Sequence, residues 1–210
     1  EGGLTESDVM VDSPTNNFAT LNPLETNDVN TTYSEGNLKA VTPATGGVAL
    51  MGSFAVPSTG AWSHECLVQA ATAGLSDNIR IGIQVSSLST PSYNVHYYSN
   101  GNKNVDGSSS AYGASFAVGD IISIDVDADN NTVTFKKNGA SQGAISYTMS
   151  DTYSPVFREA SNSIGATLIA NFGQDSSFAG NKTPQGNQDA NGIGDFYYAP
   201  PTGFLALCTS

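Results

Sequence analysis

Short apolar runs, separated by clusters of Gly, Pro, Asn and Ser, recur along the chain from Phe18 onward. The separators return at intervals of roughly 8 to 12 residues, which is the spacing of a β-sandwich or barrel rather than of alternating strands and helices. No stretch has the periodicity of an amphipathic helix. We therefore expect an all-β fold in which two antiparallel sheets form a sandwich. The pattern predicts strands at 36–41, 47–56, 61–70, 78–85, 93–98, 119–127, 131–137, 142–147, 155–160, 164–172 and 203–208.

One stretch, IISIDVDADNNTVTFKKNG at 121–139, raises the question of a calcium loop. Acidic or amide side chains occupy alternate positions there: Asp125, Asp127, Asp129 and Asn131. An EF-hand loop needs Gly at its sixth position and a bidentate Glu at its twelfth. Counted from Asp125, these positions hold Asn130 and Lys136. The second half of the motif is missing, so we expect a turn and no metal site; the alternative is a weak, solvent-exposed cation site at the turn.

The same stretch has the pattern of a β-hairpin. Ile122, Ile124 and Val126 alternate with polar residues before the turn, and Val133 and Phe135 do so after it. Asp and Asn tolerate the left-handed backbone that a tight turn needs, so residues 129–131 supply the turn. This predicts a hairpin with one solvent-facing polar side, on which lysines at 136 and 137 pair with carboxylates as exposed and weak ion pairs.

Two long polar, glycine-rich segments lack strand character, at 99–113 and 173–195. We expect both to be surface loops, where a rigid β scaffold would carry a binding surface. Residues 1–35 are expected to form an extended arm or linker, so the predicted domain spans 36–210. Glu1 stands where Met would begin a primary translation product, which suggests a processed chain or a fragment.

Composition narrows the classes of partner. The chain has 7 basic and 19 acidic residues, a formal charge of -12. A nucleic-acid binder needs a basic surface, so nucleic acid is excluded as an expected partner. No apolar run approaches the roughly 18 residues of a membrane span, and no membrane partner is expected.

Catalytic patterns are weak. GASQG at 139–143 matches the G-x-S-x-G nucleophile elbow, but the following AISYTM predicts a strand instead of the required helix. His64 and His96 lie in separate predicted strands without metal-ligand spacing, and Glu65 has no acidic neighbour on its face. We expect no catalytic residue, no cofactor and no enzyme activity.

The two cysteines, Cys66 and Cys208, both lie in apolar strand-like runs. A pair of buried free thiols and a bridge between distant strands are both open interpretations. The redox environment of the protein stays undecided at this stage.

Several motifs in order along the chain resemble the SPRY domain. They are GAWSHE (60–65), IRIGIQV (79–85), GDIISIDVDADNNTVTFKKNG (119–139), YSPVF (153–157), ANFGQ (170–174) and PPTGFLALC (200–208). The likeness is closest to SPRY-like modules in structural proteins of tailed phages, especially marine ones, where DSPTNNFATLNPL (12–24) also has a counterpart. His64 departs from the pattern, since an aromatic residue is usual there. The resemblance implies a concanavalin-like jelly-roll sandwich that serves binding or assembly without catalysis.

This resemblance implies a phage virion surface protein, either a capsid decoration or a tail-fibre component, whose partners are other virion proteins. The alternative is a carbohydrate-binding module that recognises a host-surface glycan. For that role the candidate binding residues flank or begin the 99–113 segment: Tyr93, Tyr97, Tyr98, Asn100 and Tyr112. Tyrosine rings near loops can stack on sugars, although core packing would equally explain them. A glucanase-like hydrolase on the same sandwich is a third, minor hypothesis.

Overall fold

The fold is described from a computed structural model that covers residues 16–26, 28–44, 47–85, 94–161 and 164–209. Within these ranges every regular element is a strand, as expected from the scarcity of helical periodicity. The strands are β1 (Leu21–Thr26), β2 (Thr32–Ser34), β3 (Lys39–Val41), β4 (Val48–Gly52), β5 (Ala61–Ala71), β6 (Ile79–Val85), β7 (Val95–Tyr98), β8 (Asn102–Val105), β9 (Ser108–Ala111), β10 (Ile121–Asp127), β11 (Thr132–Lys137), β12 (Ala140–Ser146), β13 (Tyr153–Glu159), β14 (Ala166–Asn171) and β15 (Leu205–Ala206).

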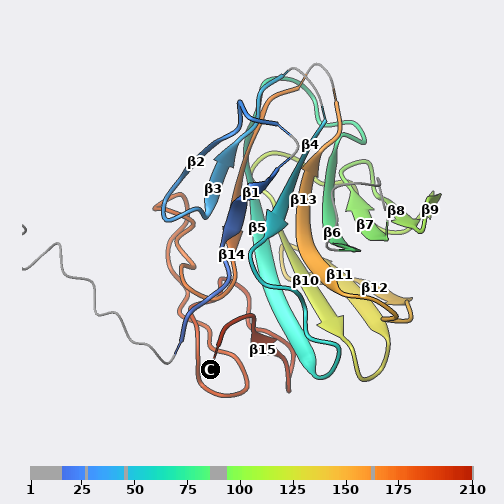
Figure 1. The fold of residues 1–210 in the computed structure, drawn as a ribbon, viewed down its shortest axis with the longest axis vertical. Helices are drawn as coiled ribbons and strands as arrows, with labels where there is room; N and C mark the ends of the chain where they lie inside the picture. The colour runs from blue at the N-terminus through green and yellow to red at the C-terminus, as the bar shows by residue number, and fades with distance from the viewer. Residues whose placement is uncertain (1–15, 27, 45–46, 86–93, 162–163, 210) are drawn as a thin grey trace, which may run out of the picture.

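The strands form two antiparallel sheets that face each other as an open sandwich (Figure 1). One sheet has the order β1-β4-β13-β6-β7-β8-β9. The other has the order β12-β11-β10-β5-β14-β3-β2, and β15 adds a short parallel pairing to β5. The predicted all-β sandwich is confirmed.

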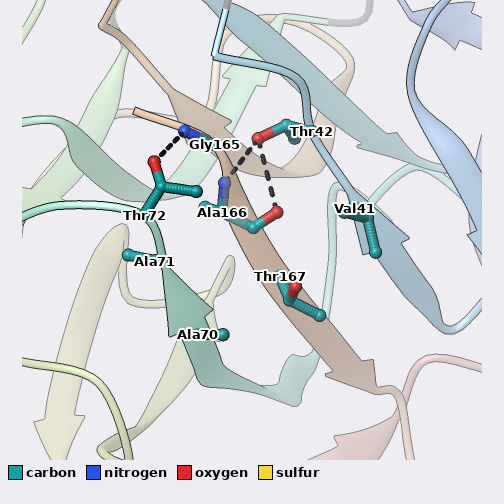
Figure 2. Close-up of a pocket in the computed structure, with 8 residues that line it drawn as sticks. All are labelled: Val41, Thr42, Ala70, Ala71, Thr72, Gly165, Ala166 and Thr167. Atoms are coloured by element: carbon teal, nitrogen blue, oxygen red, sulfur yellow. Dashed lines mark hydrogen bonds between the residues drawn. The ribbon is translucent and has the colours of Figure 1, made fainter. Parts of the chain in front are cut away.

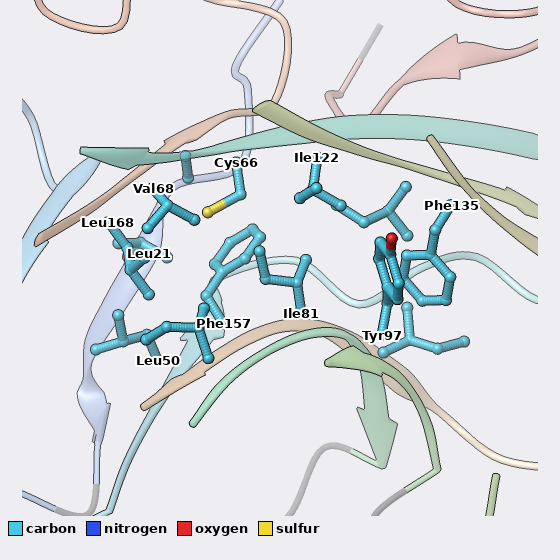
Figure 3. Close-up of a cluster of buried hydrophobic side chains, with 14 of the residues drawn as sticks. Leu21, Leu50, Cys66, Val68, Ile81, Tyr97, Ile122, Phe135, Phe157 and Leu168 are labelled. Carbon is cyan, nitrogen blue, oxygen red and sulfur yellow. The ribbon is translucent and has the colours of Figure 1, made fainter. Parts of the chain in front are cut away.

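The core fills the space between the sheets, and Figure 3 shows part of it. β6 contributes Ile81 and β13 contributes Phe157 from one sheet, and these meet Cys66 of β5 and Ile122 of β10 from the other. Successive residues of a strand point to opposite faces, so alternate positions of each strand enter this core. Removing a large ring such as that of Phe157 would cost about 3–5 kcal/mol of stability.

Strand β5 shows how this alternation places polar groups. Cys66 and Val68 face the core, and His64 lies on the same side. The His64 ring stacks on Phe172 with 5.7 Å between ring centroids and meets the Phe157 ring edge-on at 6.0 Å. The His64 ring therefore lies where the SPRY pattern usually has an aromatic residue.

The predicted hairpin at 121–137 is confirmed, but its polar side is not exposed as predicted. β10 and β11 pair in the register Ile124 opposite Phe135. Asp125 is buried, accepts a hydrogen bond from Ser63 Oγ at 2.6 Å, and forms an ion pair with Lys136 at 2.7 Å. The second lysine, Lys137, reaches Asp120 at 3.2 Å rather than a carboxylate of the hairpin. The prediction of a weak, solvent-exposed lysine pairing is wrong for Asp125, because this face of the sheet is covered.

The cover includes residues 173–204, called here the C-terminal segment. Phe178 of this segment packs with Leu67, Ile121 and Ile169 in a second apolar cluster on the outer face of the sheet. Figure 1 shows the segment as an irregular stretch beside β14 and β15. The prediction of a surface loop at 173–195 is therefore wrong for Phe178 and its neighbour Ala179, which belong to a third layer on the sheet.

Glu65 fastens the C-terminal segment to the sheet. Its carboxylate accepts the backbone N–H groups of Tyr197 and Tyr198, each at 2.9 Å, and the Asn171 amide at 3.1 Å. Burial raises the pKa of Glu65 to about 7, and these donors oppose that rise. The buried Glu65 carboxylate thus binds the C-terminal segment to the sheet through these hydrogen bonds.

Other expectations are also revised. The 99–113 segment, expected to be a loop, contains the hairpin β8–β9. Leu21 and Tyr33 of the expected arm pack with the core, so the sandwich begins before Gly36. Cys66 and Cys208 are not bridged to each other, which settles the two open interpretations in favour of thiols, with Cys66 buried and Cys208 half-buried. Burial raises the pKa of the Cys66 thiol, which makes it unreactive.

Candidate functional site

The loops at one end of the sandwich are joined into a single surface. It comprises the β4–β5 connection (53–60), the β8–β9 turn (106–107), the β10–β11 turn (128–131) and the β12–β13 connection (147–152). We call this surface the loop end. In Figure 1 the β10–β11 turn and the start of β5 lie together at the lower end of the molecule.

Two of these loops are held together at Gly60. Its N–H donates to Asp129 Oδ1 at 3.0 Å, and its carbonyl accepts from Ala128 N at 2.9 Å. Gly60 has φ of 82°, a conformation that favours glycine. The Trp62 indole donates to Thr59 O at 2.8 Å, which fixes the half-buried ring beside the loop.

Asn131 connects the β10–β11 turn to the β12–β13 connection. Its side-chain oxygen accepts from Met149 N at 3.0 Å, and its carbonyl accepts from Tyr147 N at 2.8 Å. Asn131 adopts a left-handed φ of 53°, which Asn tolerates better than most residues. The turn predicted from the sequence is thus confirmed, and its Asn also supports a neighbouring loop.

Tyr147 extends the network to the β8–β9 turn. Its hydroxyl donates to Asp106 Oδ1 at 3.0 Å, and Asn94 donates from one amide nitrogen to Tyr147 Oη at 3.2 Å and to Asp106 at 3.1 Å. Desolvation raises the pKa of Tyr147, so the hydroxyl keeps its proton at neutral pH. The loop end is therefore braced by hydrogen bonds across its loops.

The loop end is acidic. It carries Asp106, Asp129 and Asp151, all exposed, and Asp127 lies half-buried at the end of β10. Of the four loops as described, none contains Lys or Arg. Half-buried Phe54, Trp62, Tyr147 and Met149 lie among these loops and pack against the core. The surface thus combines negative charge with apolar side chains held in place, a combination that suits recognition of a protein.

The tyrosine-based site predicted from the sequence is not assembled. Tyr93 lies outside the described residues. Tyr97 is 0% exposed and packs in the core against Phe135, with its hydroxyl donating to Ala114 O. A sugar cannot stack on this ring, and the prediction that Tyr97 contacts a ligand is corrected.

The other predicted site residues point in different directions. Tyr98 is 6% exposed, and the Arg80 guanidinium lies 4.5 Å from its ring centroid. Tyr112 is half-buried, meets Tyr97 edge-on at 5.4 Å, and donates from its hydroxyl to Gly143 O. Asn100 is exposed, and its side-chain oxygen accepts from Asn102 N at 2.9 Å in a local turn. The structure therefore brings Tyr97 and Tyr112 together but creates no shared platform.

The sequence reasoning did not single out the loop end as a site. In the sequence, Asp127 and Asp129 stand in a candidate metal loop or turn, and no motif includes Asp106 or Asp151. The signal available was the repeated placement of Asp in short polar gaps between strands of a chain with charge -12. Pairing between strands that are far apart in the sequence brings these aspartates together. The pattern of hydrophobic and polar residues does not specify that pairing.

A small pocket lies on the opposite part of the sheet, between β3, β5 and β14 (Figure 2). Its volume is about 150 Å³, and Val41, Ala70 and Ala71 are among its lining residues. The hydroxyl of Thr72 accepts from Gly165 N at 3.0 Å, and that of Thr42 accepts from Ala166 N at 3.0 Å. Because the Thr42 and Thr72 hydroxyls already accept hydrogen bonds from the backbone, they are less available to orient a polar ligand.

Neither a metal site nor the nucleophile elbow takes shape in the described residues. Among the residues that the structure describes, no group of three or more His, Cys, Asp or Glu could hold a metal ion. Ser141 lies in β12, which continues as a strand to Ser146, so no nucleophile elbow forms there. In the same described part of the chain, no helix has the length and apolarity that crossing a membrane requires.

Comparison with solved structures identifies the fold. The SPRY domain of human HERC1 matches with a TM-score of 0.63 and 16% identity, over 71% of this chain and 96% of that one. The fold is SPRY-like.

Two other solved structures agree with this SPRY-like fold. The TRIM65 PSpry domain matches with a TM-score of 0.55 and 12% identity, over 73% of this chain and 92% of that one. Stonustoxin matches with a TM-score of 0.53 and 16% identity, over 73% of this chain and 27% of that one. No protein-family model and no curated protein matched the sequence. At these identities the likeness concerns the fold alone.

Proposed function

We propose that this chain is a non-catalytic protein-binding module that presents its loop end to a basic surface on a partner protein. The observation that carries the proposal is the loop end itself, where exposed aspartates in loops that contain no Lys or Arg lie among half-buried aromatic side chains. The SPRY-like resemblance, which implies a binding or assembly role, supports the same function.

Electrostatics would act mainly on the rate and the specificity of association. A surface of one sign steers a partner of opposite sign and raises the association rate, and salt screens this effect over about 8 Å at physiological ionic strength. The half-buried aromatic residues would supply most of the affinity, because such side chains dominate binding energy at interfaces. The braced loops lower the entropy lost on binding.

We further propose that the partner is another virion protein and that the chain lies on the surface of a phage particle, as a capsid decoration or a fibre component. This finer proposal is supported by the sequence resemblance to structural proteins of tailed phages. Mass spectrometry of purified particles tests it: hundreds of copies per particle would indicate capsid decoration, and tens or fewer would indicate a fibre. Absence of the chain from particles would contradict it.

The role of the loop end is tested with two triple variants that each remove three negative charges. The first carries Asp106→Asn, Asp129→Asn and Asp151→Asn, which keep a hydrogen-bond acceptor at each turn. The matched control carries Glu25→Gln, Asp28→Asn and Asp77→Asn, away from the loop end. Each chain is added to particles that lack it, and the bound amount is quantified as salt is raised.

We expect the loop-end variant to associate at least tenfold more slowly at low salt and to lose most of its salt dependence, whereas the control behaves as wild type. Equal losses for both triple variants would assign the effect to net charge and contradict a specific role of the loop end. Wild-type binding by the loop-end variant would contradict it as well.

A further inference from the structure

A second pocket lies beside the loop end, where the N-terminal part of the sandwich meets the beginning of the C-terminal segment. Thr20 in its wall donates from its N–H to Ser53 Oγ of the β4–β5 connection at 2.9 Å. It has a volume of about 530 Å³, within the roughly 300–1,000 Å³ common for small-molecule sites. We call it the Phe18 pocket. Its walls include Asn16, Asn17, Phe18, Glu35, Gln174 and Asp175.

The aromatic wall is fixed by close packing. A Cβ atom at Gly173 would come within 2.8 Å of Phe18 Cε1, so the phenyl ring lies directly against a glycine backbone. Phe18 also forms an isolated bridge with Cys208, which holds the strand that carries the ring. The ring is half-buried and lines the pocket with its remaining surface.

Two polar walls are fixed by bonds within the protein. Gln174 accepts from Phe172 N at 2.7 Å and donates to Ala19 O at 2.8 Å. Asp175 accepts from Ser177 N at 2.8 Å and from Ala179 N at 2.7 Å. These contacts keep the wall rigid, which preorganises a site for a ligand.

Three other polar side chains have free hydrogen-bonding capacity. The side chains of Asn16, Asn17 and Glu35 make no hydrogen bond to any residue in the described ranges. An amide offers both donors and acceptors, and a carboxylate offers acceptors only. Neighbouring hydroxyl groups, which donate and accept, match this set.

The charge of the pocket selects against anions. Glu35 and Asp175 are acidic, and no Lys or Arg is among the described lining residues. A phosphate, a sulfate or a sialic acid carboxylate would be repelled. We propose that the Phe18 pocket binds a neutral sugar unit, whose apolar ring face packs on Phe18 and whose hydroxyls bond to Asn16, Asn17 and Glu35.

The test begins with an array of neutral and sialylated glycans, followed by an NMR titration with the neutral glycan that is retained best. The variant is the double substitution Asn17→Ala with Glu35→Ala, at two exposed positions whose loss leaves the core intact. The loop-end triple variant serves as the control, so a failure of this proposal is distinguishable from a failure of the loop-end proposal. Unchanged unfolding temperatures establish that both variants are folded.

We expect wild type and the loop-end variant to bind the neutral glycan equally and the double variant to bind at least tenfold more weakly. Chemical-shift changes should centre on the amides of residues 16–20 and 174–175. Retention of no neutral glycan would overturn the proposal. Unchanged affinity of the double variant, or tighter binding of the sialylated form, would overturn it too.

Discussion

At the scale of single residues, the most unusual group is the His64 ring in the core. Among the residues that the structure describes, neither of its nitrogens has a hydrogen-bond partner, and His64 is 0% exposed. Burial lowers its pKa to about 3, so the ring is neutral at physiological pH. An unsatisfied buried polar atom costs roughly 1–3 kcal/mol, which makes His64 a destabilising residue held in place by its aromatic neighbours.

The substitution His64→Phe is therefore expected to stabilise the protein by about 1–2 kcal/mol at pH 7, after allowing for the slightly larger ring. The phenyl ring would keep the stack on Phe172 and remove both unsatisfied nitrogens. Urea unfolding of the two proteins measures the change. A loss of stability would show that the imidazole has a partner or a packing role that this account lacks.

The same residue makes stability depend on pH. The pKa of His64 is lower in the folded protein than the ordinary value of 6.5, so the unfolded chain binds more protons below that pH. With respect to this residue, the fold therefore has its full stability above about pH 6.5 and loses stability as the pH falls from 6.5 toward 3. Relative to His64→Phe, the wild type should lose about 1.4 kcal/mol of unfolding free energy per pH unit between pH 6 and 4. Parallel pH profiles for the two proteins would contradict this linkage.

At the scale of elements, the sequence predicts the pairing of neighbouring strands well. It predicts poorly which face of a sheet is covered by a segment distant in the sequence. Alternation at Ile122, Ile124 and Phe135 was enough to predict β10–β11, because one face of that hairpin meets the core. The burial of Asp125 could not be predicted, because it depends on side chains from β5 and on the cover of the outer face.

The other revised segments have equally specific reasons. The SSSA sequence of β9 has no apolar alternation, and all its residues are exposed, so backbone pairing to β8 alone makes it a strand. In the C-terminal segment, Phe178 and Phe196 are both fully buried and were the available signal of packing. Glycine and polar residues around them masked that signal.

The substitution of Glu65 tests whether the C-terminal segment forms a separate layer on the sheet. We expect Glu65→Ala to cost about 3 kcal/mol, because it leaves the N–H groups of Tyr197 and Tyr198 and the Asn171 amide without their acceptor. Hydrogen exchange should increase for amides of residues 173–204 before it increases in β10.

The exposed residue Glu35 offers the matched control for this experiment. Glu35→Ala should change stability by no more than about 0.5 kcal/mol and leave exchange unaltered. Uniform exchange throughout the Glu65→Ala variant would show that the C-terminal segment is not a separate layer.

At the scale of the whole molecule, the two sheets act as a rigid frame that gathers acidic turns at one end. None of these turns is a site by itself. They become one surface because β5, β10, β11, β12 and β13 begin or end at the same level of the sandwich. The Phe18 pocket adjoins this surface through Thr20 and Ser53 but shares none of its residues, so the two regions offer separate contacts.

The claim that the loop end is the contact surface is tested most directly by site-specific photo-crosslinking on intact particles. One chain carries a benzophenone side chain at the exposed position Thr148 of the loop end, and the other carries it at the exposed position Ala117, beyond the opposite end of β10. The account predicts crosslinks to a second virion protein from position 148 and none from position 117. Crosslinks from position 117 with none from position 148 would contradict it.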